Sequence, residues 1–425
     1  MLIKNANIHG REGIWDIKIE NGKFSKIGNA LTADNGEEII DASGKMVIPP
    51  YVDSHVHLDY VCTYGEPRYN MSGTLFEGIS IWSERKKTLT KADVKKRARH
   101  VIDWEIAHGT QFIRTHVNSD EPGHVSAEAL LELRDEVKDL VDLQIVAFPQ
   151  HGIYNFPDGD KLLEEVVAMG VDAVGAIPHY EDTREDLVNS LYLCFDLAEK
   201  YDKLIDVHCD ETDDPQSRAI EQVAHQAWKR GMFNRVTASH TTAMGSYNNA
   251  YAFKLMGILQ RSKINIITNS TINNHLEGRY DSYPKRRGIT RVDELLANGI
   301  NVSMGCDDIM EPFYPLGVGD MLDVLNMGLN VSHLTGYQQI QDSLRFITTN
   351  GARTLNRENV YGIEEGKPAN MLIIPAEDVY DLVRRHVKPE YSIRNGNVIM
   401  KRVPEDVTVF ANDTAAKVDY KVLKK

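Results

Sequence analysis

The chain has 425 residues, of which 42% are hydrophobic, and this length exceeds what one small core can organise. Its formal net charge of -14 argues against a nucleic-acid partner or an anionic membrane surface, because both require clustered lysines and arginines. The first residues do not form a signal sequence, and no segment approaches the roughly 18 apolar residues of a membrane span. We therefore expect a cytoplasmic protein that binds neither nucleic acid nor membrane.

Both ends of the chain show short β-strands joined by tight turns. Residues 15–27 and 391–400 each alternate apolar and polar side chains around a central Asn-Gly turn. A lone hairpin of this kind is only marginally stable in water. We therefore expect residues 1–49 and 370–425 to join into one small β-sandwich beside a different central domain.

Between these ends, residues 50–369 alternate short apolar runs with helix-length amphipathic stretches, which is the pattern of parallel βα units. Thr90 and Thr183 stand where helices should begin, and Gly109 and Gly170 stand where they should end. Eight apolar runs qualify as strands, at residues 46–57, 112–118, 143–150, 173–180, 204–211, 236–242, 264–270 and 301–308. These units predict an α/β fold, a (β/α)8 TIM-type barrel. A doubly wound open sheet is the alternative, but no glycine-rich phosphate loop follows an early strand.

The first predicted barrel strand ends in His55 and His57, whose spacing puts both imidazoles on one face of a strand, ~7 Å apart along the chain. Two hydrogen-bonded strand-end histidines would look the same, so this pair alone does not decide for a metal. His208 and Asp307 end two other strands at the same face of the barrel. Three imidazoles and a carboxylate suit a divalent cation with one position left for water. Strand four ends without a lysine that could bridge two metals, so we expect one metal ion.

Two more strand-end residues suit acid and base chemistry. Glu211 lies three residues beyond His208 and could move protons between water and a substrate, although a solvated loop acid is the alternative. His240 could orient the attacking water, whereas a lone strand-end histidine is often structural. Asp307 could also accept the proton of that water. We therefore predict Glu211, His240 and Asp307 as the catalytic residues.

Three residues could bind a flat polar ring. Gln150 offers an amide that donates and accepts at once, although it could bond to the barrel rim instead. Asp308 could hold a ring N–H or amino group, with a helix N-cap as the alternative role. Phe313 could stack on a heterocycle or belong to the core of a loop.

Several segments resemble the amidohydrolase superfamily and, within it, the cytosine deaminase family. They cover nearly the whole chain: DSHVHLD at 53–59, SGTLFEG at 72–78, VAFPQ at 146–150, DVHCDE at 206–211, ASHTTA at 238–243 and YPKRRG at 283–288. The resemblance implies iron or zinc held by the three histidines and Asp307, with Glu211 as proton shuttle and His240 on the water. It also implies that Gln150 and Asp308 bind the ring, that Leu75 belongs to the substrate pocket, and that the protein is a homo-oligomer.

The sequence departs from that family where the pocket is expected. His151 stands where the family has glutamate, Cys306 where it has histidine, Phe313 where it has tryptophan, and Ser270-Thr271 where it has Pro-Leu. We therefore include His151 and Cys306 among the candidate substrate-binding residues. The departures leave the candidate metal ligands intact, so they concern the substrate more than the reaction.

We predict metal-dependent hydrolytic deamination of a small cyclic amidine, with release of ammonia. Cytosine, converted to uracil, is the first choice, and creatinine, converted to N-methylhydantoin, is the alternative; another aminated heterocycle is a lesser option. Two other classes are a metal-stabilised binding protein without catalysis and a hydrolase that opens an amide ring. The glutamate beside His208 argues against the first of these.

Overall fold

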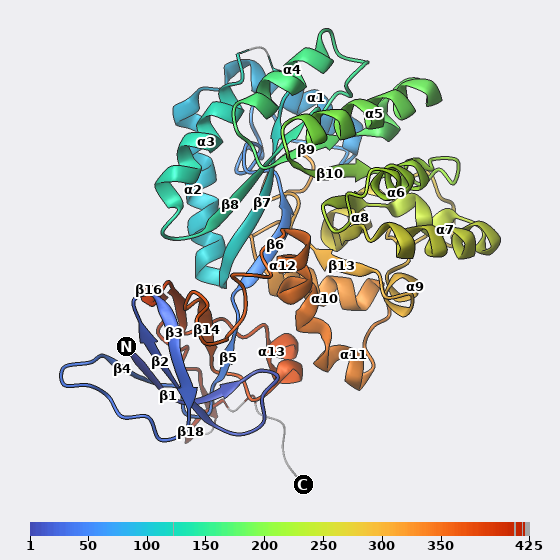
Figure 1. Ribbon diagram of the computed structural model, residues 1–425. Coiled ribbons are helices and arrows are strands. Elements are labelled where there is room, and N and C mark those ends of the chain that lie inside the picture. Colours follow the sequence, from blue (N-terminus) through green and yellow to red (C-terminus); the bar gives the residue numbers. More distant parts are fainter. Residues whose placement is uncertain (122, 412–413, 419, 421–425) are drawn as a thin grey trace.

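A computed structural model describes residues 1–121, 123–411, 414–418 and 420. Its centre is an eight-stranded parallel sheet in which each strand pairs with the next along the chain (Figure 1). The strands are β6 (Tyr51–Val56), β7 (Thr110–Asn118), β8 (Asp142–Phe148), β9 (Ala173–Ala176), β10 (Leu204–Cys209), β11 (Val236–His240), β12 (Asn265–Thr268) and β13 (Asn301–Met304). Each strand matches one of the eight runs that the sequence predicted, although β7 begins two residues and β8 one residue earlier than expected, and the (β/α)8 barrel is confirmed.

The barrel closes where the chain beyond β13 meets β6. Asp307 donates its backbone N–H to the carbonyl of His55 at 2.7 Å and accepts the N–H of His57 at 3.0 Å. Gly305 permits this approach, because a Cβ at that position would lie 2.7 Å from the backbone nitrogen and oxygen of His55. The contact that closes the barrel therefore also brings Asp307 beside His55 and His57.

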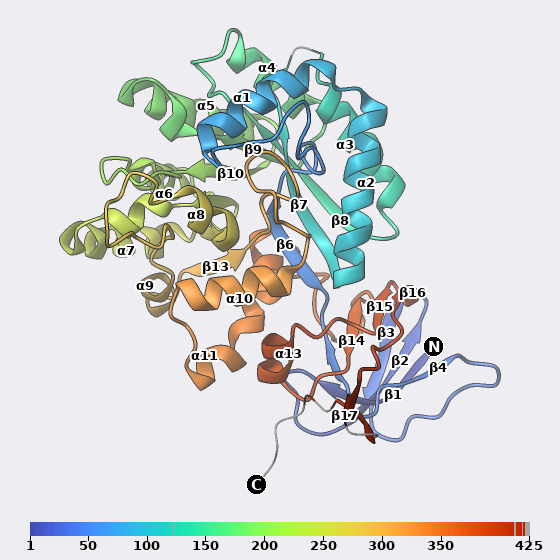
Figure 2. The same ribbon diagram turned by 180° about the vertical axis from the view of Figure 1, so that it is seen from behind.

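Helices cover the outer face of the barrel, as α2 and α3 do beside β7 and β8 (Figure 2). The predicted start signals are confirmed at Thr90 and Thr183, whose side chains accept the backbone N–H of Asp93 and Asp186. Gly109 ends α2 with a φ of 107°. The helices are α1 (Leu75–Arg85), α2 (Lys91–His108), α3 (Val125–Val137), α4 (Gly159–Ala168), α5 (Arg184–Lys200), α6 (Ala219–Lys229), α7 (Asn249–Ser262), α8 (Ser270–Leu276), α9 (Val292–Ala297), α10 (Met321–Val331), α11 (Tyr337–Gln341), α12 (Thr349–Thr354) and α13 (Val379–Arg385).

Strands from both ends of the chain form a second sheet beside the barrel, with blue N-terminal strands next to red C-terminal ones (Figure 1). Its order is β16-β15-β14-β5-β1-β2-β3, and β4 also pairs with β1. Ile3, Phe24 and Ile373 belong to its separate apolar core. The strands are β1 (Leu2–Ile8), β2 (Trp15–Glu20), β3 (Lys23–Gly28), β4 (Ile39–Asp41), β5 (Met46–Ile48), β14 (Met371–Ile374), β15 (Tyr391–Arg394) and β16 (Asn397–Lys401); a further hairpin joins β17 (Thr408–Ala411) and β18 (Thr414–Lys417).

Both predicted hairpins are present, as β2 with β3 and β15 with β16. The division of the chain at residues 49 and 370 stays a prediction, and the segment 370–425 includes residues 412–413, 419 and 421–425, which lie outside the described residues. Across the described part of the chain, no helix combines the length and apolar character needed to cross a membrane.

Arg114 and Asp206 form a buried ion pair inside the barrel. Arg114 Nη1 donates to Asp206 Oδ2 at 2.9 Å, and both side chains are excluded from solvent. The same guanidinium donates to Gln144 Oε1 and to the backbone carbonyl of Thr354. The guanidinium therefore links β7 to β8, β10 and α12, with two of its donors on Gln144 Oε1.

We expect Arg114→Met to lower the free energy of unfolding by about 3–5 kcal/mol, because the buried Asp206 carboxylate would lose its cationic partner, although Ser239 Oγ would still donate to it. Urea denaturation followed by circular dichroism measures the change. Arg99→Met is the matched control, since Arg99 pairs with Asp103 on the exposed surface of α2 and such pairs contribute about 1 kcal/mol or less. Equal losses in the two variants would contradict the role given to the buried pair.

Candidate active site

The four predicted metal ligands lie together at the carboxyl ends of the strands. His57 Nε2 and His208 Nε2 are 3.1 Å apart, and Asp307 Oδ1 lies 3.3 Å from His55 Nε2 and 3.5 Å from His57 Nε2. One ligand atom from each residue lies within 4.8 Å of the others, and all four residues are buried. The cluster is therefore compact enough to share one cation.

The protonation and hydrogen bonding of these side chains fit a divalent cation. Burial, together with neighbouring imidazoles, holds the pKa of His55, His57 and His208 well below the ordinary value, so each ring keeps a lone pair. His55 Nε2 is buried without a hydrogen-bond partner. Two imidazole nitrogens facing each other at 3.1 Å, with a carboxylate beside them, are the donor set that such a cation binds.

A hydrogen-bonded chain supports His55 from behind. His55 Nδ1 lies 3.1 Å from Ser239 Oγ, which donates to Asp206 Oδ1 at 2.6 Å. An Nδ1–H donated to Ser239 leaves the lone pair of Nε2 facing the cluster. The Asp206 carboxylate accepts hydrogen bonds from Ser239 and Arg114. It therefore supports the cluster rather than acting as one of its ligands.

The predicted acid and base residues lie beside the cluster. His240 Nδ1 is 3.0 Å from Glu211 Oε1 and 3.7 Å from Asp307 Oδ2. Burial opposes a charge on His240, but the two carboxylates outweigh it and raise its pKa to about 9. Its Nε2 is buried and has no hydrogen-bond partner among the residues that the structure describes, so this N–H can donate to another molecule in the site.

Two asparagines, which sequence analysis did not single out, complete this arrangement. Asn273 Nδ2 lies 3.1 Å from both Glu211 Oε1 and His240 Nδ1, while Asn269 Nδ2 donates to Asp307 Oδ2 at 3.1 Å. Asn269 follows β12 directly, and Asn273 lies within α8. The polar end of strand seven was the available signal for Asn269, whereas nothing in the sequence places Asn273 above the site.

A cavity opens over this centre. Its walls include four of the predicted substrate-binding residues, Leu75, Gln150, Asp308 and Phe313. The remaining lining residues are His57, Tyr60, Phe148, Ile177, His208, Glu211, His240, Leu276 and Asp307. Aromatic and aliphatic walls with a few convergent polar groups are typical of a site for a small flat molecule.

His151 does not line the cavity, although it follows Gln150 directly. Its Nδ1 lies 2.5 Å from Asp120 Oδ2, and its backbone N–H donates to the same oxygen at 2.7 Å. Lys86 Nζ approaches Nδ1 to 3.4 Å. The imidazole is therefore held by Asp120 rather than presented to the cavity.

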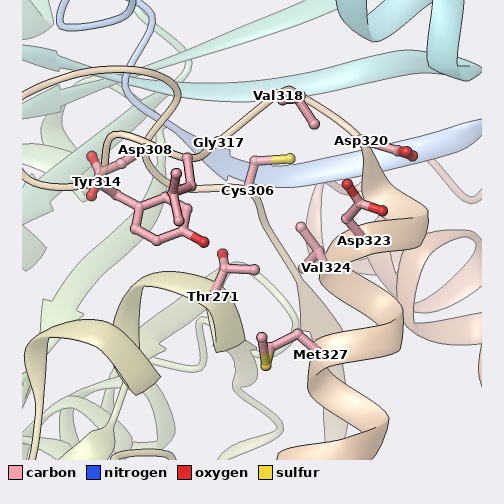
Figure 3. Close-up of a pocket in the computed structure, with 12 residues that line it drawn as sticks. Thr271, Cys306, Asp308, Tyr314, Gly317, Val318, Asp320, Asp323, Val324 and Met327 are labelled. Carbon is pink, nitrogen blue, oxygen red and sulfur yellow. The ribbon is translucent and has the colours of Figure 1, made fainter. Parts of the chain in front are cut away.

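Cys306 lies in a neighbouring cavity instead (Figure 3). Its Sγ is 3.4 Å from Met321 Sδ, and its backbone N–H donates to Asp53 Oδ1. Figure 3 shows this second cavity between Cys306 and the α10 residues Val324 and Met327, with Asp308 at one end. Asp308 lines both cavities, so a substitution at Cys306 would reach the first one only indirectly.

The Amidohydrolase family model matches residues 38–400. The chain belongs to the amidohydrolase family. It is therefore a hydrolase that acts on carbon–nitrogen bonds, and the family resemblance predicted from the sequence is confirmed. The family binds a divalent metal, and the cluster of three histidines and Asp307 could hold one.

Similar proteins include amidohydrolase-family enzymes of known structure and name. One similar structure is the crystal structure of 5-methylcytosine deaminase from Klebsiella pneumoniae, liganded with 5-fluorocytosine. Its sequence is 48% identical to this chain, the TM-score is 0.93, and the match covers 96% of this chain and 99% of that chain. N-isopropylammelide isopropyl amidohydrolase of Pseudomonas sp. (strain ADP) is 30% identical, over 94% of this chain and 97% of the relative. Pterin deaminase of Rhizobium rhizogenes is 28% identical, over 92% and 89% of the two chains.

Proposed function

We propose that the protein hydrolyses the exocyclic C–N bond of an aminopyrimidine, with cytosine or 5-methylcytosine as substrate and ammonia as product. The observation that carries the proposal is Glu211, a partly buried carboxylate that lies 3.0 Å from His240 Nδ1 beside the histidine cluster and lines the same cavity as Gln150 and Asp308. The 48% identity to a 5-methylcytosine deaminase over nearly the whole chain supports the pyrimidine ring as the substrate class.

In this proposal, His55, His57, His208 and Asp307 hold the metal. The bound cation, iron or zinc, would supply Lewis-acid activation of a water molecule. Glu211 carries one proton of the attacking water to the ring nitrogen beside the amino-bearing carbon. It then carries the second proton, from the newly added hydroxyl group, to the amino group, which leaves as ammonia while the carbonyl forms. The free Nε2–H of His240 donates to the attacking oxygen. Water replaces the amino group, so the ring gains a carbonyl and an N–H.

The substrate itself is bound by the walls of the cavity. Gln150 and Asp308 hydrogen-bond to the edge of the ring, and Phe313 packs against its face. Phe313 is also held tightly from behind, because a Cβ at Gly78 would lie 2.8 Å from its ring. Creatinine, the alternative predicted from the sequence, is also a cyclic amidine but has a smaller five-membered ring.

We expect purified protein to release ammonia from cytosine and from 5-methylcytosine, with creatinine as the comparison substrate. Mass spectrometry of the product separates deamination, which exchanges an amino group for oxygen, from ring opening, which adds a whole water. Elemental analysis of the same sample identifies iron or zinc. No ammonia from either pyrimidine, in protein that contains the metal, would contradict the proposed function.

A homo-oligomeric assembly and a cytoplasmic location stay predictions. Both are tested directly, the first by light scattering of the purified protein and the second by fractionation of cells that express it.

A further inference from the structure

Tyr60 occupies a place in the cavity that sequence analysis did not foresee. It follows β6 by a few residues and is 1% exposed, and its hydroxyl donates to Gln150 Oε1 at 2.9 Å. Its ring stacks on His57 with centroids 5.0 Å apart and an interplanar angle of 15°. Tyr60 therefore contacts both a candidate metal ligand and a candidate substrate-binding residue.

The backbone on either side of Tyr60 is fixed. Arg97 Nη1 donates to the carbonyls of Asp59 at 2.8 Å and Val61 at 2.7 Å. The Tyr60 N–H donates to the carbonyl of His57 at 3.0 Å, and the Tyr60 carbonyl accepts from Thr63 Oγ1 at 2.6 Å. A tyrosine held in this way cannot follow the movements of Gln150, so it constrains them.

The ring of Tyr60 is packed as firmly as its backbone. Trp82 lies 4.1 Å from it and Phe313 6.0 Å from it, measured between ring centroids. These aromatic residues form one apolar cluster with Ile272 under the rim of the cavity. The hydroxyl is the one polar atom of the Tyr60 side chain, and it meets the carboxamide of Gln150.

A carboxamide presents an acceptor at one end and two donors at the other, and it can turn over to exchange them. In the structure the Tyr60 hydroxyl donates to Oε1, so the carboxamide stands with Oε1 facing Tyr60. In that orientation the NH2 group of Gln150 is left for the cavity that Gln150 lines. The NH2 group of Gln150 can therefore donate a hydrogen bond to a carbonyl oxygen on a bound ring.

We propose that Tyr60 is a positioning residue that fixes the orientation of the Gln150 carboxamide, so that the cavity selects rings carrying a carbonyl oxygen over rings carrying an amino group at the position facing Gln150. This inference rests on the proposed function and specifies the substrate class of the same site. It favours 4-amino-2-oxopyrimidines, such as cytosine, over 2,4-diaminopyrimidine, because an unmatched buried donor pair weakens binding.

The test measures binding of cytosine and of 2,4-diaminopyrimidine by calorimetry, in metal-loaded protein that also carries Glu211→Gln so that neither ligand is consumed. We expect Tyr60→Phe, which keeps the ring and removes the hydroxyl, to reduce the preference for cytosine by roughly tenfold. Tyr361→Phe is the matched control, because Tyr361 also donates a buried hydroxyl bond, to the carbonyl of Pro50, outside the cavity. It should leave the preference unchanged.

Two further variants separate positioning from packing. In a Gln150→Ala background, Tyr60→Phe should have no further effect on the preference, because Tyr60 acts through Gln150. Gln150→Glu should reverse the preference, since one carboxylate oxygen accepts from Tyr60 and the other offers the cavity an acceptor.

The outcomes are distinct from those of the proposed function. Turnover of cytosine by the wild-type protein, combined with an unchanged preference in Tyr60→Phe, would overturn the role of Tyr60 alone. If the protein bound cytosine and 2,4-diaminopyrimidine equally well, or bound neither, the proposed role of Tyr60 would be overturned. This result would not depend on which substrate the enzyme converts. Wild-type protein that shows the preference but releases no ammonia would leave the role of Tyr60 standing and refute the deaminase.

Discussion

Replacing Glu211 by glutamine is expected to lower kcat about a thousandfold while the metal content stays at the wild-type level. The amide keeps the size of the side chain and can still bond to Asn273, but it cannot take a proton from water or return one to the ring. Steady-state ammonia release and elemental analysis on the same preparation measure both quantities.

Glu185→Gln is the matched control for this experiment. Glu185 lies in the first turn of α5, exposed to solvent and outside the cavity, so kcat should stay within about twofold of wild type. A Glu211→Gln protein that retains kcat, or one that loses its metal, would refute the assignment of Glu211 as the group that moves protons.

Removal of the metal is expected to abolish ammonia release and to lower the thermal stability of the protein. A chelator withdraws a ligand that binds the folded state alone, and such a ligand contributes about 4 kcal/mol when its concentration is a thousand times its Kd. Activity should return on addition of zinc or ferrous iron. Thermal unfolding of the treated and untreated protein measures the stability change.

His208→Asn tests the same cation without a chelator. The asparagine keeps a polar side chain against Phe148, which stacks on His208 at 3.9 Å, but lacks the imidazole donor. We expect more than about a 100-fold loss of metal affinity, because even residues that only support metal ligands contribute 10- to 100-fold. His100→Asn, on the exposed side of α2, should bind metal as the wild type does. Wild-type metal content in His208→Asn would contradict the proposed ligand set.

The strand-end residues could be predicted from the sequence because the fold itself gathers them. Once eight βα units are recognised, the carboxyl ends of the strands must meet at one face, so His55, His208 and Asp307 are brought together whatever the loops do. The hairpins at both ends were predictable for a similar reason, since an Asn-Gly turn fixes the pairing of its own strands.

The walls of the cavity could not be predicted in the same way. Tyr60 and Phe148 are buried aromatic residues, and in a sequence such residues look the same in a cavity wall as in a core. His151 and Cys306 show a second limit. Each adjoins a residue that lines the cavity, but Gln150 and His151 lie in a turn, and Asp307, next to Cys306, has a φ of 64°. In such irregular chain, a place beside a lining residue in the sequence does not fix which way a side chain points.

The pairing of β5 also constrains how the protein can be made on the ribosome. β5 lies between β1 and β14, and only Pro49-Pro50 separates it from the strand that ends in the two histidines. A nascent chain shorter than residue 371 would carry β5 with one edge unpaired, and exposed edges of this kind pair with other chains. Completion of this sheet therefore waits for β14, β15 and β16 to be synthesised. Truncations near the C-terminus should accordingly reduce the soluble yield before they touch any residue of the active site.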